Sequence, residues 1–354
     1  MNPLEHELQY PFGDTLPEPG RAMEIAPGLR WVRMGLPFAL DHINLWLLRD
    51  TVDGRDGWTV VDCGIADDAT RAAWEDVIAN GLDGLPVVRV LCTHMHPDHL
   101  GLADWLVRRF DCGLWMTAGE YGIGRTLATG TRDPEATLRH LRRAGVPDGP
   151  MLEAVRARST DHFRRLVPAV PLAFHRLRED EPVRIGGRHW RVIVGTGHSP
   201  EHASLHCCDG PGGMPVLISG DMVLPRISTN VSVFDIEPEA DPVNWYLRSL
   251  MKYEHCPADT LVLPSHGRPF TGLHVRVRQQ VDHHAERLDE LLAACRERPM
   301  SAHDALAVLF RRELDAHQMM FALGEALAHL HALWKGGKVR LETGSDGVRR
   351  FPAA

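Results

Sequence analysis

Short apolar runs separated by turn-forming residues dominate the first part of the chain, as is typical of β-strands. Helical spacing of apolar residues appears in two places, from Asp67 to Asn80 and again at Leu102, Leu106 and Phe110. The predicted strands cover Leu29 to Arg33, Asn44 to Leu48, Trp58 to Val61 and Val87 to Cys92. This alternation of strands and helices predicts an α/β fold.

The same pattern returns after an interruption. The Arg-rich stretch from Glu120 to about Phe174 alternates helical segments with Gly and Pro, which predicts a helical insertion at about 120–175. Strands resume at Pro182 to Ile185 and Arg188 to Val194, and Gly186-Gly187 between them indicates a hairpin. Asp241-Pro242 predicts the N-cap and first turn of a helix. Further strands are predicted over Ala203 to Cys207, Val216 to Ser219 and Thr260 to Leu263.

The chain becomes predominantly helical beyond Gly272. Ser301 and Asp304 have the spacing of a capping box at the start of one of these helices. The predicted elements are helices over Arg276 to Cys295, Ser301 to Leu314 and Gln318 to Trp334, then a hairpin of Val339 to Leu341 and Val348 to Phe351. We therefore predict an α/β domain over residues 1–273 and a winged-helix-like domain over 274–354.

Residues 94 to 99 place three histidines and an aspartate directly after a predicted strand: His94, His96, Asp98 and His99. Imidazole nitrogen and carboxylate oxygen are the usual ligands of zinc and related divalent ions. Alternate residues of an extended chain point the same way, so His94 and His96 can bind one ion together. Asp98 could instead only N-cap the following helix, although capping and ligation can coexist.

Other predicted strands also end in residues that can bind metal or support a ligand, namely Asp62, His198, Asp221 and His266. Loops at strand ends commonly build the active sites of α/β folds, so we expect these residues at one edge of the sheets. His202 lies near His198, and we expect it to hydrogen-bond the loop backbone. The remaining histidines, including those of the C-terminal helices, are assigned no chemistry.

Composition narrows the functional classes. The chain has 44% hydrophobic and 24% charged residues and a formal net charge of −8, which does not favour a nucleic-acid-binding protein. Its seven cysteines lack C-x-x-C spacing, so neither a disulfide framework nor a thiolate zinc site is indicated. The first twenty residues lack the basic and apolar regions of a secretion signal. We expect a cytoplasmic protein without a membrane partner.

The segment from Thr93 to Gly101, with His198, Asp221 and His266, resembles the metallo-β-lactamase-fold hydrolase superfamily. The resemblance implies an αββα sandwich with two metal ions at one edge. It implies that His94, His96 and His198 bind one ion, that Asp98, His99 and His266 bind the other, and that Asp221 bridges them. Asp62 would be a carboxylate that holds one of the metal-binding histidines in place. The implied ions are most simply Zn²⁺, with Fe or Mn as alternatives.

Details of the motifs indicate which branch of the superfamily the chain resembles. Asp221 argues against the true zinc β-lactamases, which lack a carboxylate there, and His96 argues against the di-iron flavoproteins, which have Glu. The loop Gly197-His198-Ser199-Pro200-Glu201-His202 is similar to the G-H-[ST]-P-G-H loop of glyoxalase II and related thioesterases, except for Glu201. With its helical C-terminal region, the chain most resembles the glyoxalase II-like branch that includes β-lactamase-like protein 2.

We therefore predict a dinuclear metal hydrolase in which a bridging hydroxide attacks a thioester or similar small acyl ester. Asp98 is the predicted catalytic residue, which orients the water or accepts its proton. A phosphodiesterase or endoribonuclease is the main alternative. A mononuclear-iron persulfide dioxygenase and a DNA-binding regulator are weaker ones. The expected partner is a small acyl substrate, nucleic acid is not expected, and a homodimer is left open.

Overall fold

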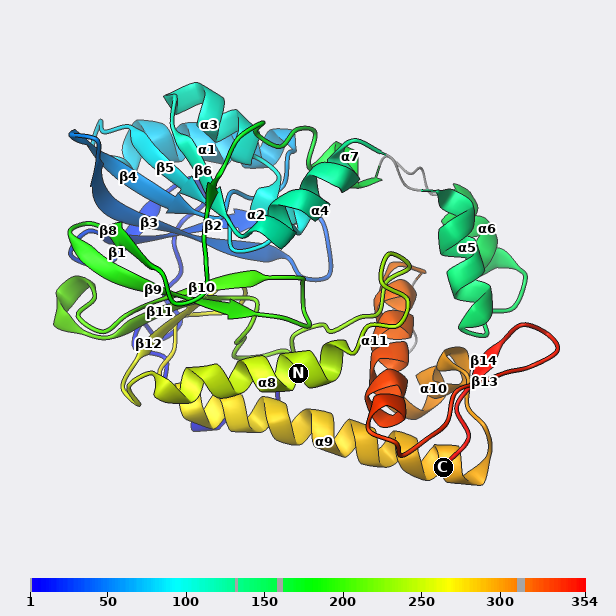
Figure 1. Cartoon of the computed structure of the whole chain (residues 1–354). Coiled ribbons are helices and arrows are strands. Elements are labelled where there is room, and N and C mark those ends of the chain that lie inside the picture. Colours follow the sequence, from blue (N-terminus) through cyan, green and yellow to red (C-terminus); the bar gives the residue numbers. More distant parts are fainter. Residues whose placement is uncertain (1, 131–132, 158–161, 311–315) are drawn as a thin grey trace.

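The computed structural model describes residues 2–130, 133–157, 162–310 and 316–354. Two β-sheets pack face to face, and helices cover both outer faces (Figure 1). The first sheet has the strand order β1-β2-β3-β4-β5-β6-β7, and the second has the order β12-β11-β10-β9-β8. This four-layer arrangement confirms the predicted αββα sandwich.

The strands of the first sheet are β1 (Ala22–Ala26), β2 (Leu29–Gly35), β3 (His42–Val52), β4 (Arg55–Val61), β5 (Val87–Leu91), β6 (Gly113–Met116) and β7 (His175–Arg176). Those of the second are β8 (Pro182–Ile185), β9 (Arg188–Gly195), β10 (His202–Cys207), β11 (Val216–Gly220) and β12 (Leu261–Pro264). The sequence missed β1, β6 and β7. Each sheet contains both antiparallel and parallel strand pairs. The parallel pairing begins between β4 and β5 in the first sheet, and β11 pairs with β12 in parallel in the second.

The helices of the sandwich and insertion are α1 (Asp68–Asn80), α2 (Pro97–Leu100), α3 (Ala103–Phe110), α4 (Ala118–Ala128), α5 (Pro134–Arg143), α6 (Pro150–Ala157), α7 (His162–Leu166) and α8 (Pro242–Leu250). Short 3-10 turns are η1 (Glu5–Glu7), η2 (Pro211–Gly213) and η3 (Met251–His255). Asp241 is the N-cap residue of α8 and Pro242 its first residue, as predicted. The Asp241 side chain accepts a hydrogen bond from the Asn244 side-chain amide rather than from a backbone N–H.

The C-terminal region consists of α9 (Leu273–Glu297), α10 (Ala302–Leu309), α11 (Ala316–Lys335) and the hairpin strands β13 (Glu342–Thr343) and β14 (Arg349–Arg350). The capping box of Ser301 and Asp304 forms as predicted. The first hairpin strand lies later than the predicted Val339 to Leu341, because Val339 is buried and bridges Ala353 instead. The predicted end of the middle helix at Leu314 lies outside the described residues.

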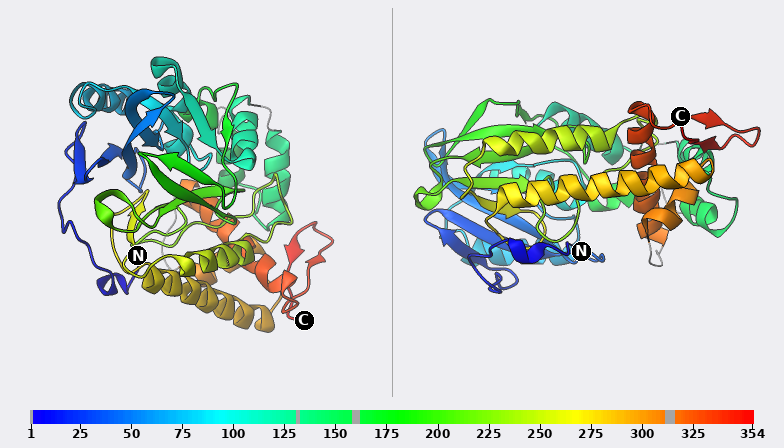
Figure 2. Two further views of the ribbon diagram at one scale, coloured as in Figure 1. Left: turned by 60° about the vertical axis from the view of Figure 1, so that its left-hand side comes forward. Right: turned by 90° about the horizontal axis from the view of Figure 1, so that it is seen from below.

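Three apolar clusters hold the layers together. Trp31 and Trp46 of the first sheet face Trp190 of the second in the cluster between the sheets, and all three are buried. A second cluster joins the outer face of the first sheet to α1 and α3. The third continues from the second sheet through α8 and α9 to the C-terminal helices. Figure 2 shows α9 extending past the sandwich to reach α11, so the C-terminal region shares its core with the second sheet.

Candidate metal centre

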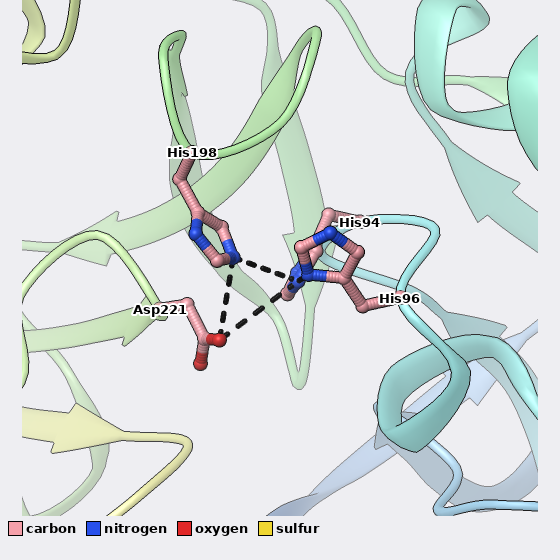
Figure 3. A group of neighbouring side chains, drawn as sticks. All are labelled: His94, His96, His198 and Asp221. Carbon is pink, nitrogen blue, oxygen red and sulfur yellow. Dashed lines mark hydrogen bonds and ion pairs between the residues drawn. The ribbon is translucent and has the colours of Figure 1, made fainter. Parts of the chain in front are cut away.

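The predicted ligands converge from the loops after β5, β9, β11 and β12. Figure 3 shows the four that come from the first three of these loops: His94, His96, His198 and Asp221. His94 is fully buried, and its Nε2 lies 2.9 Å from His96 Nδ1 and 3.2 Å from His198 Nε2. Asp221 Oδ2 lies 3.3 Å from His198 Nε2. We call these four residues the first ligand group. Their ligand atoms all lie within 4.8 Å of one another.

Asp98, His99 and His266 form the second ligand group. Asp98 Oδ2 lies 3.4 Å from His266 Nε2 and 3.6 Å from His99 Nε2. Asp98 is in the first turn of α2, whose N-cap position is His96, so Asp98 does not serve as the helix cap. Its side chain is 18% exposed, compared with 10% for Asp221, which leaves it the more accessible carboxylate.

Asp221 connects the two groups through its two oxygens. While Oδ2 faces His198, Oδ1 lies 3.4 Å from His266 Nε2 and 3.7 Å from His99 Nε2. Among the described residues, Asp221 Oδ1 and His99 Nε2 are buried without a hydrogen bond. Unpaired buried polar atoms are costly, and a cation between them removes that cost. This arrangement fits two divalent ions that share one carboxylate.

Hydrogen bonds made by Nδ1 of His198 and His266 determine that Nε2 is the nitrogen available to a metal ion. His198 Nδ1 bonds the Asn230 carbonyl at 2.8 Å, and His266 Nδ1 bonds the His42 carbonyl at 2.7 Å. A carbonyl can only accept, so both Nδ1 atoms carry hydrogen. In the neutral rings the Nε2 lone pairs are then free to bind metal, which is the usual arrangement behind a metal-bound histidine.

Asp62 lies behind the second group and contacts His99. It is 1% exposed and has φ 63°, a left-handed backbone that directs its carboxylate under the histidine loop. Oδ2 accepts from His99 Nδ1 at 2.8 Å, and Oδ1 accepts from Thr93 N at 2.8 Å. Asp62 therefore orients His99 and holds the start of the ligand loop.

The metal-free charge pattern favours a cation in the second group. Burial works against protonation of His266, but the charges of Asp221 and Asp98 outweigh it and raise its pKa to about 10. Burial and the neighbouring His198 lower the pKa of His96 to about 3. In the metal-free protein, the proton on His266 therefore balances part of the negative charge of Asp221 and Asp98. A bound divalent ion would take over this role.

His202 is not part of either group. Its Nε2 accepts from the Asp221 backbone N–H at 3.1 Å, as expected of a histidine that supports the loop. A Cβ at Gly220 would lie 2.3 Å from this nitrogen, so the position requires glycine. His202 therefore helps to place Asp221.

Sequence reasoning missed several residues that support the ligands. Glu120 of α4 joins two ligand loops, and Arg276 of α9 holds the loop after Asp221 through the carbonyls of Leu224 and Ile227. Their partners lie far away along the chain, and neither residue belongs to a recognisable motif. Glu201, which contacts the start of α4, is the only one of these supporting residues with a sequence signal, because it replaces the second glycine of the G-H-[ST]-P-G-H loop.

The fold and the ligand groups together define an αββα protein with a candidate metal centre, and comparison with known proteins specifies the family. Residues 39–266 match the profile described as Metallo-beta-lactamase superfamily, and residues 288–354 match the profile described as Metallo-beta-lactamase-like, C-terminal domain. The chain belongs to the metallo-beta-lactamase superfamily. Among the described residues, no helix combines the length and apolar character needed to cross a bilayer.

Several individual proteins are similar over most of the chain. A beta-lactamase domain protein from Burkholderia ambifaria is 56% identical, with a TM-score of 0.92 and full coverage of both chains. A metallo-beta-lactamase family protein from Thermus thermophilus is 27% identical, with a TM-score of 0.75 over 94% of this chain and 100% of the other. The probable metallo-hydrolase YqjP of Bacillus subtilis is 24% identical over 88% of this chain and 97% of its own length.

Proposed function

We propose that this protein hydrolyses a thioester or a related small acyl ester at a centre of two divalent metal ions. The observation that carries the proposal is the position of Asp221, whose two oxygens face separate ligand groups. His94, His96 and His198 would hold one ion, and Asp98, His99 and His266 would hold the other. We propose Zn²⁺ for both, since nitrogen and carboxylate ligands suit it.

Bound ions would supply Lewis acidity, which polarises the substrate carbonyl and lowers the pKa of a shared water. Asp98 is suited to orient that water as a hydrogen-bond acceptor. Burial works against ionisation of Asp98, but His99 and His266 outweigh it and lower its pKa to about 2. Asp98 is therefore an ionised hydrogen-bond acceptor in the metal-free protein at neutral pH, and its partial exposure allows contact with substrate.

The sequence Gly197-His198-Ser199-Pro200 supports a thioester because it resembles the corresponding loop of glyoxalase II-like thioesterases. A thiol is much more acidic than an alcohol, so a thiolate can depart without full protonation. A centre whose neighbouring carboxylate is ionised suits such a leaving group.

Two structural observations weigh against a nucleic-acid substrate. The helical insertion carries many arginines, but Arg139 pairs with Asp133 at 3.0 Å and Arg142 with Asp148 at 3.2 Å. These pairs neutralise charge that an RNA-binding groove would need. Helix α11, the candidate recognition helix of a DNA-binding regulator, is buried over most of residues 322–333. Burial of this stretch leaves few side chains of α11 available for base contacts, which favours a packing role for the helix.

The test is a hydrolysis panel with protein loaded separately with Zn²⁺, Mn²⁺ or Fe²⁺. Acyl-CoA and glutathione thioesters would be compared with a bis-aryl phosphodiester and single-stranded RNA. We expect thioester hydrolysis that chelation abolishes, that metal restores, and that Asp98→Asn reduces by about 100-fold or more. Cleavage of RNA or phosphodiester without thioester hydrolysis would overturn the proposed substrate class. Oxygen consumption with a persulfide would indicate a dioxygenase instead.

A further inference from the structure

Glu120 is a fully buried carboxylate outside both ligand groups. Its Oε2 accepts from Met95 N at 2.9 Å. Its Oε1 accepts from Ser199 Oγ and from Glu201 N, both at 2.7 Å. Met95 stands between His94 and His96, and Ser199 directly follows His198. One carboxylate thus joins the loop with two histidines of the first ligand group to the loop with the third.

Glu201 also contacts the start of α4, the helix that carries Glu120. Its Oε2 accepts from Gly119 N at 2.8 Å, in the first turn of α4, and its carbonyl accepts from Thr117 Oγ1 at 2.7 Å. The amides of a first helical turn lack partners within the helix and favour a negative charge. A Cβ at Gly119 would lie 3.1 Å from Glu201 Cδ, so the helix start and this side chain are in close contact.

We propose that Glu120 and Glu201 form a carboxylate brace that positions His198 against His94 and His96 and thereby sets the metal affinity of the first ligand group. Both are positioning residues, since neither belongs to a ligand group. The brace also gives a reason for Glu201 where related thioesterases carry glycine, because glycine has no carboxylate for the start of α4. The inference rests on the proposed metal centre but not on the choice of substrate.

The second ligand group has different supports. Asp62 holds His99, and the His42 carbonyl holds His266. Neither contact involves the brace. Its loss should therefore weaken the first group selectively, whereas a general loss of packing should weaken both groups.

Glu120→Gln tests the brace with little change of volume. The three partners of Glu120 are N–H or O–H donors that reach both carboxylate oxygens. A glutamine side chain has one oxygen and carries an NH₂ group in place of the other. At least one of the three donors would then face an N–H donor and lose its hydrogen bond. Glu201→Gly is the second variant and leaves Glu120 in place. The matched controls are Glu135→Gln, in the exposed first turn of α5, and Glu237→Gly, in an exposed turn.

Each variant would be made in the full chain with His266→Ala, which leaves the first group, and separately with His198→Ala, which leaves the second. Competition with a chromophoric chelator then measures Zn²⁺ affinity. With His266→Ala, we expect either brace variant to weaken Zn²⁺ binding about 10- to 100-fold. With His198→Ala, and with both controls, we expect unchanged affinity. Equal weakening in both backgrounds, or no weakening in either, would overturn the proposal.

Discussion

His99 donates its Nδ1 hydrogen to Asp62 Oδ2 at 2.8 Å, and this bond decides which nitrogen of His99 faces the metal centre. Asp62 has a positive φ, a conformation that asparagine tolerates better than most residues. Asp62→Asn should therefore keep the backbone but lose the charged acceptor. We expect the affinity of the second ligand group for Zn²⁺ to fall about 10- to 100-fold in a chelator competition. Asp68→Asn, on the exposed side of α1, is the control, and equal affinities for the two variants would exclude this role of Asp62.

Asp221 is the residue whose loss should affect both ligand groups. Asp221→Asn retains the shape but replaces one oxygen with an N–H₂ donor and removes the shared charge. We expect less than one bound ion per chain after dialysis, measured by plasma mass spectrometry. The exposed Asp209→Asn should retain the metal content of the unaltered protein. Full retention of both ions by Asp221→Asn would show that it is not a shared ligand.

Arg276 connects the C-terminal helix α9 to the loop that follows Asp221. It is 4% exposed and donates from Nε to the Leu224 carbonyl at 2.5 Å and from Nη2 to the Ile227 carbonyl at 2.7 Å. Arg276→Met leaves these buried acceptors without a donor. We expect the free energy of unfolding in urea to fall by about 2–5 kcal/mol. Arg278→Met, at an exposed position of the same helix, should change it by less than about 0.5 kcal/mol. A similar loss in both variants would contradict the proposed contact.

Metal binding should strengthen as pH rises. In the metal-free protein the pKa of His266 is raised to about 10, and that of His99 is also raised, so both rings hold protons at neutral pH. An ion must displace them because it binds the unprotonated nitrogen. Calorimetry in buffers of different ionisation enthalpy should detect about one to two protons released per ion at the second group. Affinity that is constant between pH 6 and 8 would contradict this linkage.

Local patterns predicted the alternating strands and helices and the cluster of candidate ligands, and the family resemblance supplied the αββα layers. Buried strands are continuous apolar runs, and the loop after each strand begins at a defined place, so His94, His198 and His266 could be related before their distances were known. Hydrophobic periodicity also placed α1 and β2 within a few residues of their observed bounds. The family resemblance then supplied the division of the ligands into two groups.

The elements and residues that the sequence missed depend on long-range contacts. Strand β7 has only two residues, and β6 begins at Gly113 in a segment with the composition of a turn. Both are strands because a neighbouring strand supplies hydrogen bonds. Glu120 looks like any helical glutamate until the fold brings Ser199 and Met95 to it. Such partners cannot be found from spacing along one chain.

The number of divalent ions per chain tests the central claim most directly. The protein would be freed of metal with a chelator, equilibrated with excess Zn²⁺, passed through a desalting column and analysed by plasma mass spectrometry. Two ligand groups that share Asp221 predict two ions per chain, with one remaining in His266→Ala and one in His198→Ala. A single ion per chain in the unaltered protein, unchanged by either substitution, would contradict a dinuclear centre.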